Sequence, residues 1–180
     1  MARVQLFHRL SGRGVPFYRS NDRNRTIEHV PIPRLYAKLF VLPTDAADRD
    51  YPDTLRDSWA PEALLDTGAP LTVFPFPIWQ PFADAIQWLD QPPPPPTGRH
   101  LTVLGGDFSY RLGRLRFGVI DEHESWLPAV ASPALFLDDH LRAPKRAILG
   151  LRTHLLDSRL LRCAGSSDEK IGQVWTLEDS

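Results

Sequence analysis

The sequence predicts a mostly-β domain that contains one or two short helices. Apolar runs of about four to eight residues recur along the chain, and proline, glycine or short polar segments bound them, as is typical of strands. Residues 115–120 alternate apolar and polar side chains, which is the pattern of a half-buried strand. Gly105-Gly106 separates two strand-like runs, as the turn of a β-hairpin does. Together these patterns favour a sheet-based fold over a helical one.

The individual elements follow from the same patterns. Strands are expected at residues 35–42, 63–65, 71–74, 101–104, 107–110, 115–120, 128–131, 147–150 and 173–177. Apolar residues at helical spacing predict helices at 82–89 and 151–161, and residues 133–141 are expected to form a helical turn or a loop. The five prolines Pro92–Pro96 predict an extended polyproline segment, which we interpret as a stiff spacer rather than a ligand for an SH3-type domain.

Length and composition are those of one compact domain. The chain has 180 residues, enough to bury a core without disulfides or metals, and its net charge of −1 makes a nucleic-acid partner unlikely. A single cysteine, Cys163, excludes an internal disulfide framework and a multi-cysteine zinc site, and we expect it to be a small core residue. The sequence shows neither the apolar core of a secretory signal nor a run of transmembrane length, so a cytoplasmic location without a membrane partner is expected.

Residues 1–34 differ in composition from the rest of the chain. Arginines outnumber acidic residues there, and glycine, serine and asparagine lie between them. Such a segment can bind nucleic acid or an acidic partner, but a solvated extension or a strand at a subunit edge is the favoured interpretation. We therefore divide the chain into a basic N-terminal arm or edge strand at 1–34 and one domain at 35–180.

The most informative run is residues 63–75, with Asp66-Thr67-Gly68-Ala69 at its centre. One apolar strand brings Asp66 to a tight turn, and a second apolar strand returns the chain to the core. Gly68 leaves room beside the carboxylate and permits the geometry of the turn, while the hydroxyl of Thr67 can donate a stabilising hydrogen bond. In this arrangement the run resembles the turn on which an aspartic protease presents its catalytic carboxylate.

A second motif lies much later in the chain. Ala147-Ile148-Leu149-Gly150 is an apolar strand that ends in glycine and precedes a helical pattern. Over roughly residues 35–177 the two motifs together resemble the retropepsins, the retroviral-type aspartic proteases. The resemblance implies a half-barrel completed by homodimerisation, in which Ile148 and Gly150 lie beneath the catalytic turn. Thr67 would then clamp the two turns across the dimer axis, and Ala69 would keep the floor close to the substrate.

The resemblance also implies a flap, a glycine-tipped β-hairpin that covers the substrate. Residues 101–110 match it, with Leu104, Gly105 and Gly106 at the tip as the residues that would contact a bound peptide. Phe108 and Leu149 are the expected apolar walls of the substrate pocket. Pro70 and Leu71 replace an acidic pair found in some retroviral enzymes, so contacts made at those positions are not carried over to this chain.

The chemistry requires two carboxylates that share one proton, and only one Asp-Thr-Gly is present in the sequence. Asp138 and Asp157 lack the glycine that follows Asp66-Thr67, and Asp107 falls within the predicted flap hairpin. The second carboxylate is therefore expected from Asp66 of another copy, in a two-fold homodimer that hydrolyses a peptide or protein substrate. Residues 174–177 and part of the N-terminal arm would form a sheet between the subunits.

Other chemistry has little support in the sequence. Residues 121–124 carry metal-ligand side chains, but a solvated charged loop is the favoured interpretation, and neither a metal nor a cofactor is expected. Two alternatives to the protease remain open. One is a catalytically silent module that dimerises or holds peptides. The other is a dimerisation platform whose basic arm binds nucleic acid.

Overall fold

The structure is a computed structural model, and it describes residues 2–10, 15–18, 27–30, 33–42, 61–66, 68–89, 100–103, 106–138, 144–150, 156, 159–165 and 173–179. The strands are β1 (Arg3–Leu10), β2 (Val15–Tyr18), β3 (Ile27–Val30), β4 (Pro33–Val41), β5 (Glu62–Asp66), β6 (Thr72–Phe74), β7 (Gln87–Trp88), β8 (His100–Val103), β9 (Gly106–Ile120), β10 (Trp126–Leu137), β11 (Ala147–Gly150), β12 (Arg159–Gly165) and β13 (Gln173–Asp179). The helices are α2 (Phe76–Trp79) and the 3₁₀ helix η2 (Gln80–Ala85). The predicted mostly-β class is confirmed.

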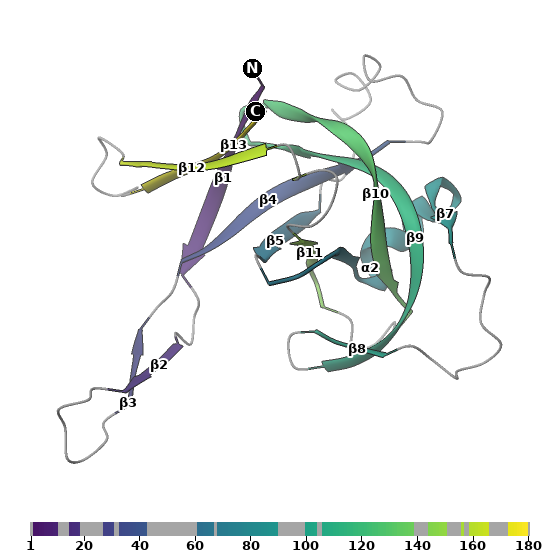
Figure 1. Cartoon of the computed structure of the whole chain (residues 1–180), viewed down its shortest axis with the longest axis horizontal. Coiled ribbons are helices and arrows are strands. Elements are labelled where there is room, and N and C mark those ends of the chain that lie inside the picture. The colour runs from purple at the N-terminus through teal and green to yellow at the C-terminus, as the bar shows by residue number, and fades with distance from the viewer. Residues whose placement is uncertain are drawn as a thin grey trace.

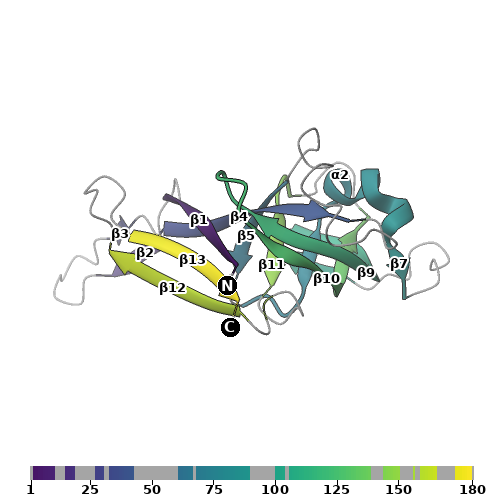
Figure 2. The ribbon, with the colours of Figure 1, turned by 90° about the horizontal axis from the view of Figure 1, so that it is seen from above.

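Six strands close into a barrel (Figure 1). They are paired in the circular order β4, β5, β11, β6, β10 and β9, and β9 pairs again with β4. The hairpin strand β8 and the short β7 pair with β9 at the rim. Strands β1, β13 and β12 extend from β4 to one side of the barrel (Figure 2), and β2 pairs with β3 in a separate hairpin.

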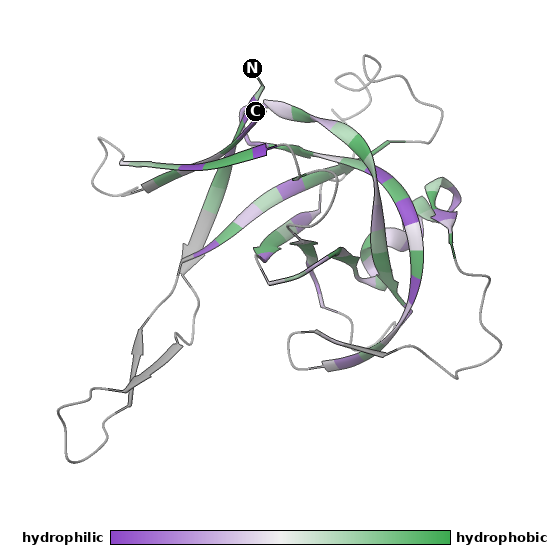
Figure 3. Cartoon of the chain, viewed as in Figure 1, coloured by the Kyte–Doolittle hydropathy of each residue, from purple (hydrophilic) through white to green (hydrophobic). Residues whose placement is uncertain are grey.

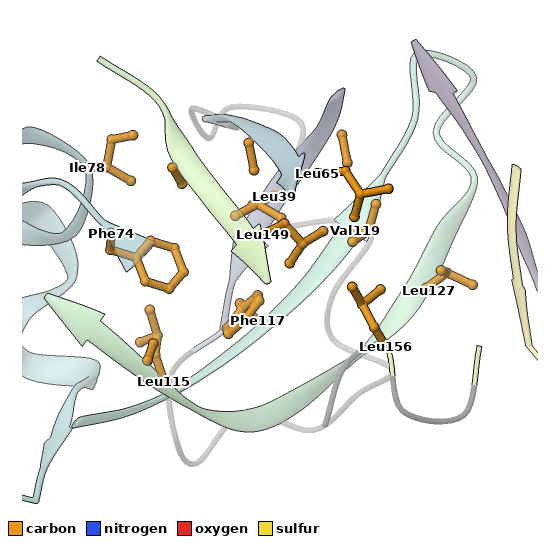
Figure 4. Close-up of a cluster of buried hydrophobic side chains, with 14 of the residues drawn as sticks. Leu39, Leu65, Phe74, Ile78, Leu115, Phe117, Val119, Leu127, Leu149 and Leu156 are labelled. Carbon is orange, nitrogen blue, oxygen red and sulfur yellow. The ribbon is translucent and has the colours of Figure 1, made fainter. Parts of the chain in front are cut away.

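The barrel encloses the main hydrophobic core, in which side chains from most of its strands meet (Figure 4). Phe74 lies at the centre of an aromatic group, 5.6 Å from the stacked ring of Phe136 and 5.3 Å from the edge-on ring of Phe117. Hydrophilic and hydrophobic residues alternate along β9 (Figure 3), so that one side of this long strand faces the core. The alternation includes residues 115–120, for which the sequence predicted it.

The helix predicted at 82–89 is wrong in its second half. The helical region begins earlier, at Phe76, and ends at Ala85, after which Gln87 and Trp88 form β7 and pair with β9. Tertiary packing explains the change, because Trp88 contacts the rings of Trp79 and Phe136 at 5.6 and 5.3 Å. An extended strand brings this side chain onto the barrel, so packing overrides the local helical spacing.

The helical turn or loop predicted at 133–141 is also wrong for residues 133–137. Residues 126–137 form one continuous strand, β10, which is longer than the strand predicted at 128–131. It pairs with β9 along its length and with β6 in parallel. Hydrogen bonds to β9 and β6 satisfy the backbone N–H and C=O groups of β10. In a helix the same groups would have been satisfied by hydrogen bonds within the segment.

The helix predicted at 151–161 is wrong at its end, because residues 159–161 belong to β12. Among residues 151–158 only Leu156 is described, and it is a buried turn residue. Strand β12 pairs with β13 over its whole length.

Arg159, the first residue of β12, forms an ion pair with Asp179. Burial lowers the pKa of the Arg159 guanidinium below its ordinary value, and the charge of Asp179 opposes that shift.

The C-terminal strand is confirmed, but its surroundings differ from the expectation. β13 pairs with β1 on one edge and with β12 on the other, within the same chain. Residues 175–177 are therefore paired on both edges within the described part of this chain. Cys163 in β12 is exposed, which corrects its predicted place in the core.

Several predicted segments lie outside the described residues. These are the polyproline segment Pro92–Pro96, residues 104–105 of the predicted hairpin and residues 151–155 of the predicted helix. The division of the chain at residue 34 stays a prediction. Among the described residues, no helix has both the length and the apolar character needed to cross a membrane.

Candidate functional site

Asp66 is the last residue of β5 and is held at the start of a tight turn. Its Oδ1 accepts a hydrogen bond from the backbone N–H of Gly68 at 2.9 Å, and its carbonyl oxygen accepts one from the N–H of Ala69 at 3.2 Å. Ala63 and Leu65 are buried beneath it and anchor the strand in the core. The carboxylate is therefore oriented by the backbone and remains partly exposed at the surface.

The turn that follows Asp66 faces solvent. Gly68 and Pro70 are exposed in the single chain, while Ala69 is half-buried. A Cβ atom at position 68 would lie 3.4 Å from Asp66 Oδ1, which is an ordinary van der Waals contact. Gly68 therefore keeps open the space beside the carboxylate oxygen. Thr67 lies outside the described residues, so its predicted clamp stays a prediction.

Strand β11 lies directly beside the turn. It is parallel to β5, with Gly150 opposite Asp66, and it also pairs with β6 on its other side. A Cβ atom at position 150 would lie only 2.6 Å from the backbone carbon and oxygen of Leu71 and 2.8 Å from the oxygen of Ala69. The chain after Asp66 can cross the end of β11 at this distance only because residue 150 has no side chain.

The two central residues of β11 face opposite sides of the sheet. Leu149 is fully buried in the main core, on the side away from Asp66. Ile148 belongs instead to a second apolar cluster beside the turn, which also contains Val73, Phe108, Leu135 and Leu137, with Ala69, Leu71, Tyr110 and Leu112 packed against it. This cluster, which we call the turn-side cluster, joins the β8–β9 hairpin to the segment that follows Asp66.

The predicted hairpin is present, and its arms are β8 and the start of β9. Val103 pairs with Gly106, and Leu101 with Phe108. The Phe108 ring covers Gly106, because a Cβ atom at 106 would lie 2.5 Å from it. The tip residues Leu104 and Gly105 lie outside the described residues. The arms are thus attached to the turn-side cluster through Phe108.

A pocket that the sequence analysis missed lies on the same sheet face as Asp66. It has a volume of about 140 Å³ and is lined by Arg34, Tyr36, Leu64, Pro144, Lys145, Arg146, Ala147 and Ile148. Leu64 is two residues before Asp66 in β5, so strand alternation alone could have placed it on that face. The other lining residues come from β4, from the approach to β11 and from β11 itself, and the pairing of β4 and β11 with β5 is visible only in the folded chain.

The charged residues at 121–124 form a turn. The Asp121 carboxylate accepts hydrogen bonds from the backbone N–H groups of His123, Ser125 and Gln5, at 2.8, 2.9 and 3.0 Å. Asp121 therefore links the β9–β10 connection to β1. Within the described ranges, no group of three or more His, Cys, Asp and Glu side chains is placed to hold a metal ion.

No protein-family model matches the sequence, and no curated protein matches it. Among solved structures, the chain is similar to a retropepsin-like aspartic protease from Rickettsia conorii, with 11% sequence identity and a TM-score of 0.43. The match covers 97% of this chain and 98% of that one. A likeness at this level carries no argument about activity, so the function of this chain is inferred from its own residues.

Proposed function

We propose that this chain is a retropepsin-like aspartic endopeptidase whose active site contains two Asp66 carboxylates, one from each subunit of a homodimer. The observation that carries the proposal is the geometry around Asp66. A buried strand ends in this carboxylate, the N–H of Gly68 orients it, and Gly150 lets the following turn pack closely against β11. A surface loop with no catalytic role has little need for this support.

Peptide hydrolysis follows from two such carboxylates that share one proton. The ionised carboxylate removes a proton from a water molecule, whose oxygen attacks the scissile carbonyl carbon. The protonated carboxyl donates a hydrogen bond to the carbonyl oxygen, and the amide nitrogen gains a proton as the C–N bond breaks. Two carboxylates in contact cannot both ionise, so their pKa values separate and belong to the pair.

The second carboxylate has to come from another copy of the chain. Asp66 belongs to the one Asp-Thr-Gly of the sequence. Among the other described aspartates, Asp138 is paired with Arg111 at 3.0 Å and Asp121 organises a turn. The exposed positions of Gly68 and Pro70 leave the turn accessible to a second turn across a two-fold axis.

The substrate would lie between the turn and the β8–β9 hairpin as an added strand. The hairpin would act as the flap, with its tip at 104–106. We assign the apolar wall to Phe108 and Ile148, because both belong to the turn-side cluster. The sequence predicted Leu149 as a wall residue, but we assign this role to Ile148. Leu149 faces the main core and supports the site from beneath.

The test is cleavage of a diverse peptide library at high protein concentration, with the oligomeric state measured in the same sample. High concentration matters because a dissociated dimer has no complete site. Cleavage by the dimer supports the proposal. A confirmed dimer that binds peptides without cleaving them would instead identify the catalytically silent module. Salt-sensitive binding of an oligonucleotide, without either activity, would favour the nucleic-acid platform.

Gly68→Ala is expected to leave the fold intact and to lower kcat/KM by about 100-fold, because a small displacement of water or substrate has effects of that size. The new methyl group meets Asp66 Oδ1 at 3.4 Å, so folding needs no rearrangement, but it occupies the space beside the carboxylate. Thermal unfolding and peptide cleavage, measured together, separate the two effects. Activity within about twofold of wild type would contradict an open site at Gly68.

Phe108→Ala is expected to cost about 3 to 5 kcal/mol in the free energy of unfolding, because it removes a buried aromatic ring. It should also lower kcat/KM per folded molecule, since the hairpin loses the contact that Phe108 makes with the turn-side cluster. Phe136→Ala is the matched control, because this ring is buried in the main core. Both variants should unfold more easily, but only Phe108→Ala should lose activity at a temperature where both are folded. Equal activity would argue against the role of the hairpin as a flap.

A further inference from the structure

We propose that the pocket beside Asp66 selects an acidic side chain, glutamate or aspartate, next to the scissile bond. The inference rests on the proposed function, and it adds the substrate class to it. It follows from the position of the pocket, the charges that line it and the apolar surface at its base.

The pocket lies where a residue adjacent to the cleaved bond would place its side chain. Leu64 and Asp66 share one face of β5, and strand geometry separates them by about 7 Å along the strand. Ile148 is opposite Leu64 in β11 and lines the same pocket. A peptide held with its scissile carbonyl at Asp66 would therefore direct a neighbouring side chain into this pocket.

The charged residues that line the pocket are all cations. Arg146 is largely neutralised, because its Nε donates to Glu62 Oε2 at 2.9 Å and its guanidinium lies 5.4 Å from the centre of the Tyr36 ring. Arg34 and Lys145 are exposed, and neither takes part in the ion pairs among the described residues. Arg34 and Lys145 thus leave the pocket with a positive charge that no described carboxylate balances.

The apolar residues that line the pocket also suit an acidic side chain. Tyr36, Leu64 and Ile148 can contact the methylene groups, while the rim cations bind the carboxylate. A two-fold dimer repeats the pocket, so the preference should apply on both sides of the cleaved bond.

The test uses peptides that differ only at the residue flanking the cleaved bond: Glu, Gln, Leu or Lys. At about pH 6 the glutamate is ionised, and kcat/KM should be about fivefold higher for Glu than for Gln and lowest for Lys. Arg34→Gln and Lys145→Gln should each remove part of the Glu preference, and added salt should weaken it. Arg114→Gln is the matched control, because Arg114 is also an exposed strand arginine but does not line the pocket, and it should change nothing.

A binding measurement separates this inference from the proposed hydrolysis. The Asp66→Asn chain is titrated with the same four peptides, and the Glu peptide should bind about fivefold more tightly than the Gln peptide. Binding selectivity without any cleavage by wild type would support the acidic pocket and refute the protease. Cleavage with equal kcat/KM for Glu and Gln would support the protease and refute the acidic pocket. A preference that Arg34→Gln and Lys145→Gln leave unchanged would also refute it.

Discussion

Replacing Asp66 with asparagine is expected to lower kcat/KM for peptide hydrolysis by about 10⁴-fold or more. Asparagine has nearly the same shape, and its Oδ1 can still accept the hydrogen bond that Gly68 donates to the carboxylate. The amide cannot take a proton from water, however, so the chemical step is lost while the turn is preserved. Peptide cleavage and thermal unfolding of the same sample check both parts of this expectation.

The matched control is Asp84→Asn, which removes an exposed carboxylate in η2. It should keep activity within about twofold of wild type. Equal activity in Asp66→Asn and wild type would remove the support for Asp66 and point to a contaminating protease. Loss of activity in both variants would show that overall charge, rather than this one carboxylate, determines the rate.

Mixing wild type with Asp66→Asn tests whether each copy contributes one carboxylate. If subunits exchange freely in an equal mixture, only about a quarter of the dimers contain two intact aspartates. Activity should then fall to about a quarter of that of the same total amount of wild-type chain. A fall to about half would mean that each chain acts alone, which contradicts the shared site.

Gly150→Ala is expected to destabilise the fold by about 3 kcal/mol, the upper part of the range for overpacked sites. The added Cβ would lie 2.6 Å from backbone atoms of Leu71 and 2.8 Å from the oxygen of Ala69. Backbone atoms cannot rotate away as the end of a side chain can, so the segment after Asp66 has to move. Urea unfolding measures the loss of stability, and peptide cleavage should show a loss of activity in the fraction that stays folded.

Gly165→Ala is the matched control, because Gly165 also lies in a strand but its Cβ would meet no atom within 4 Å. This variant should change stability by less than about 1 kcal/mol. If Gly150→Ala proved as stable as Gly165→Ala, the close crossing of the turn over β11 would be wrong. The support that we assign to Asp66 would fail with it.

The sequence by itself was sufficient for several of the strands and for the position of Asp66. Strand alternation, apolar runs and the glycine-rich turns are local signals, and they placed β4, β5, β11, β13 and the β8–β9 hairpin correctly. The turn after Asp66 is also local, because the N–H that orients the carboxylate is only two residues away. Properties that depend on neighbouring residues in the chain can be predicted from their order.

Tertiary structure alone decided the rest. Apolar spacing at 82–89 and 151–161 fits a helix, but Trp88 packs onto the barrel and residues 159–161 pair with β13, so both regions end as strands. In the same way, the pocket beside Asp66 joins Arg34 and Lys145, which are 111 positions apart in the sequence, through the pairing of β4 with β5 and of β5 with β11. Contacts between distant strands release more free energy than local preferences do, and residue order does not state which strands will meet.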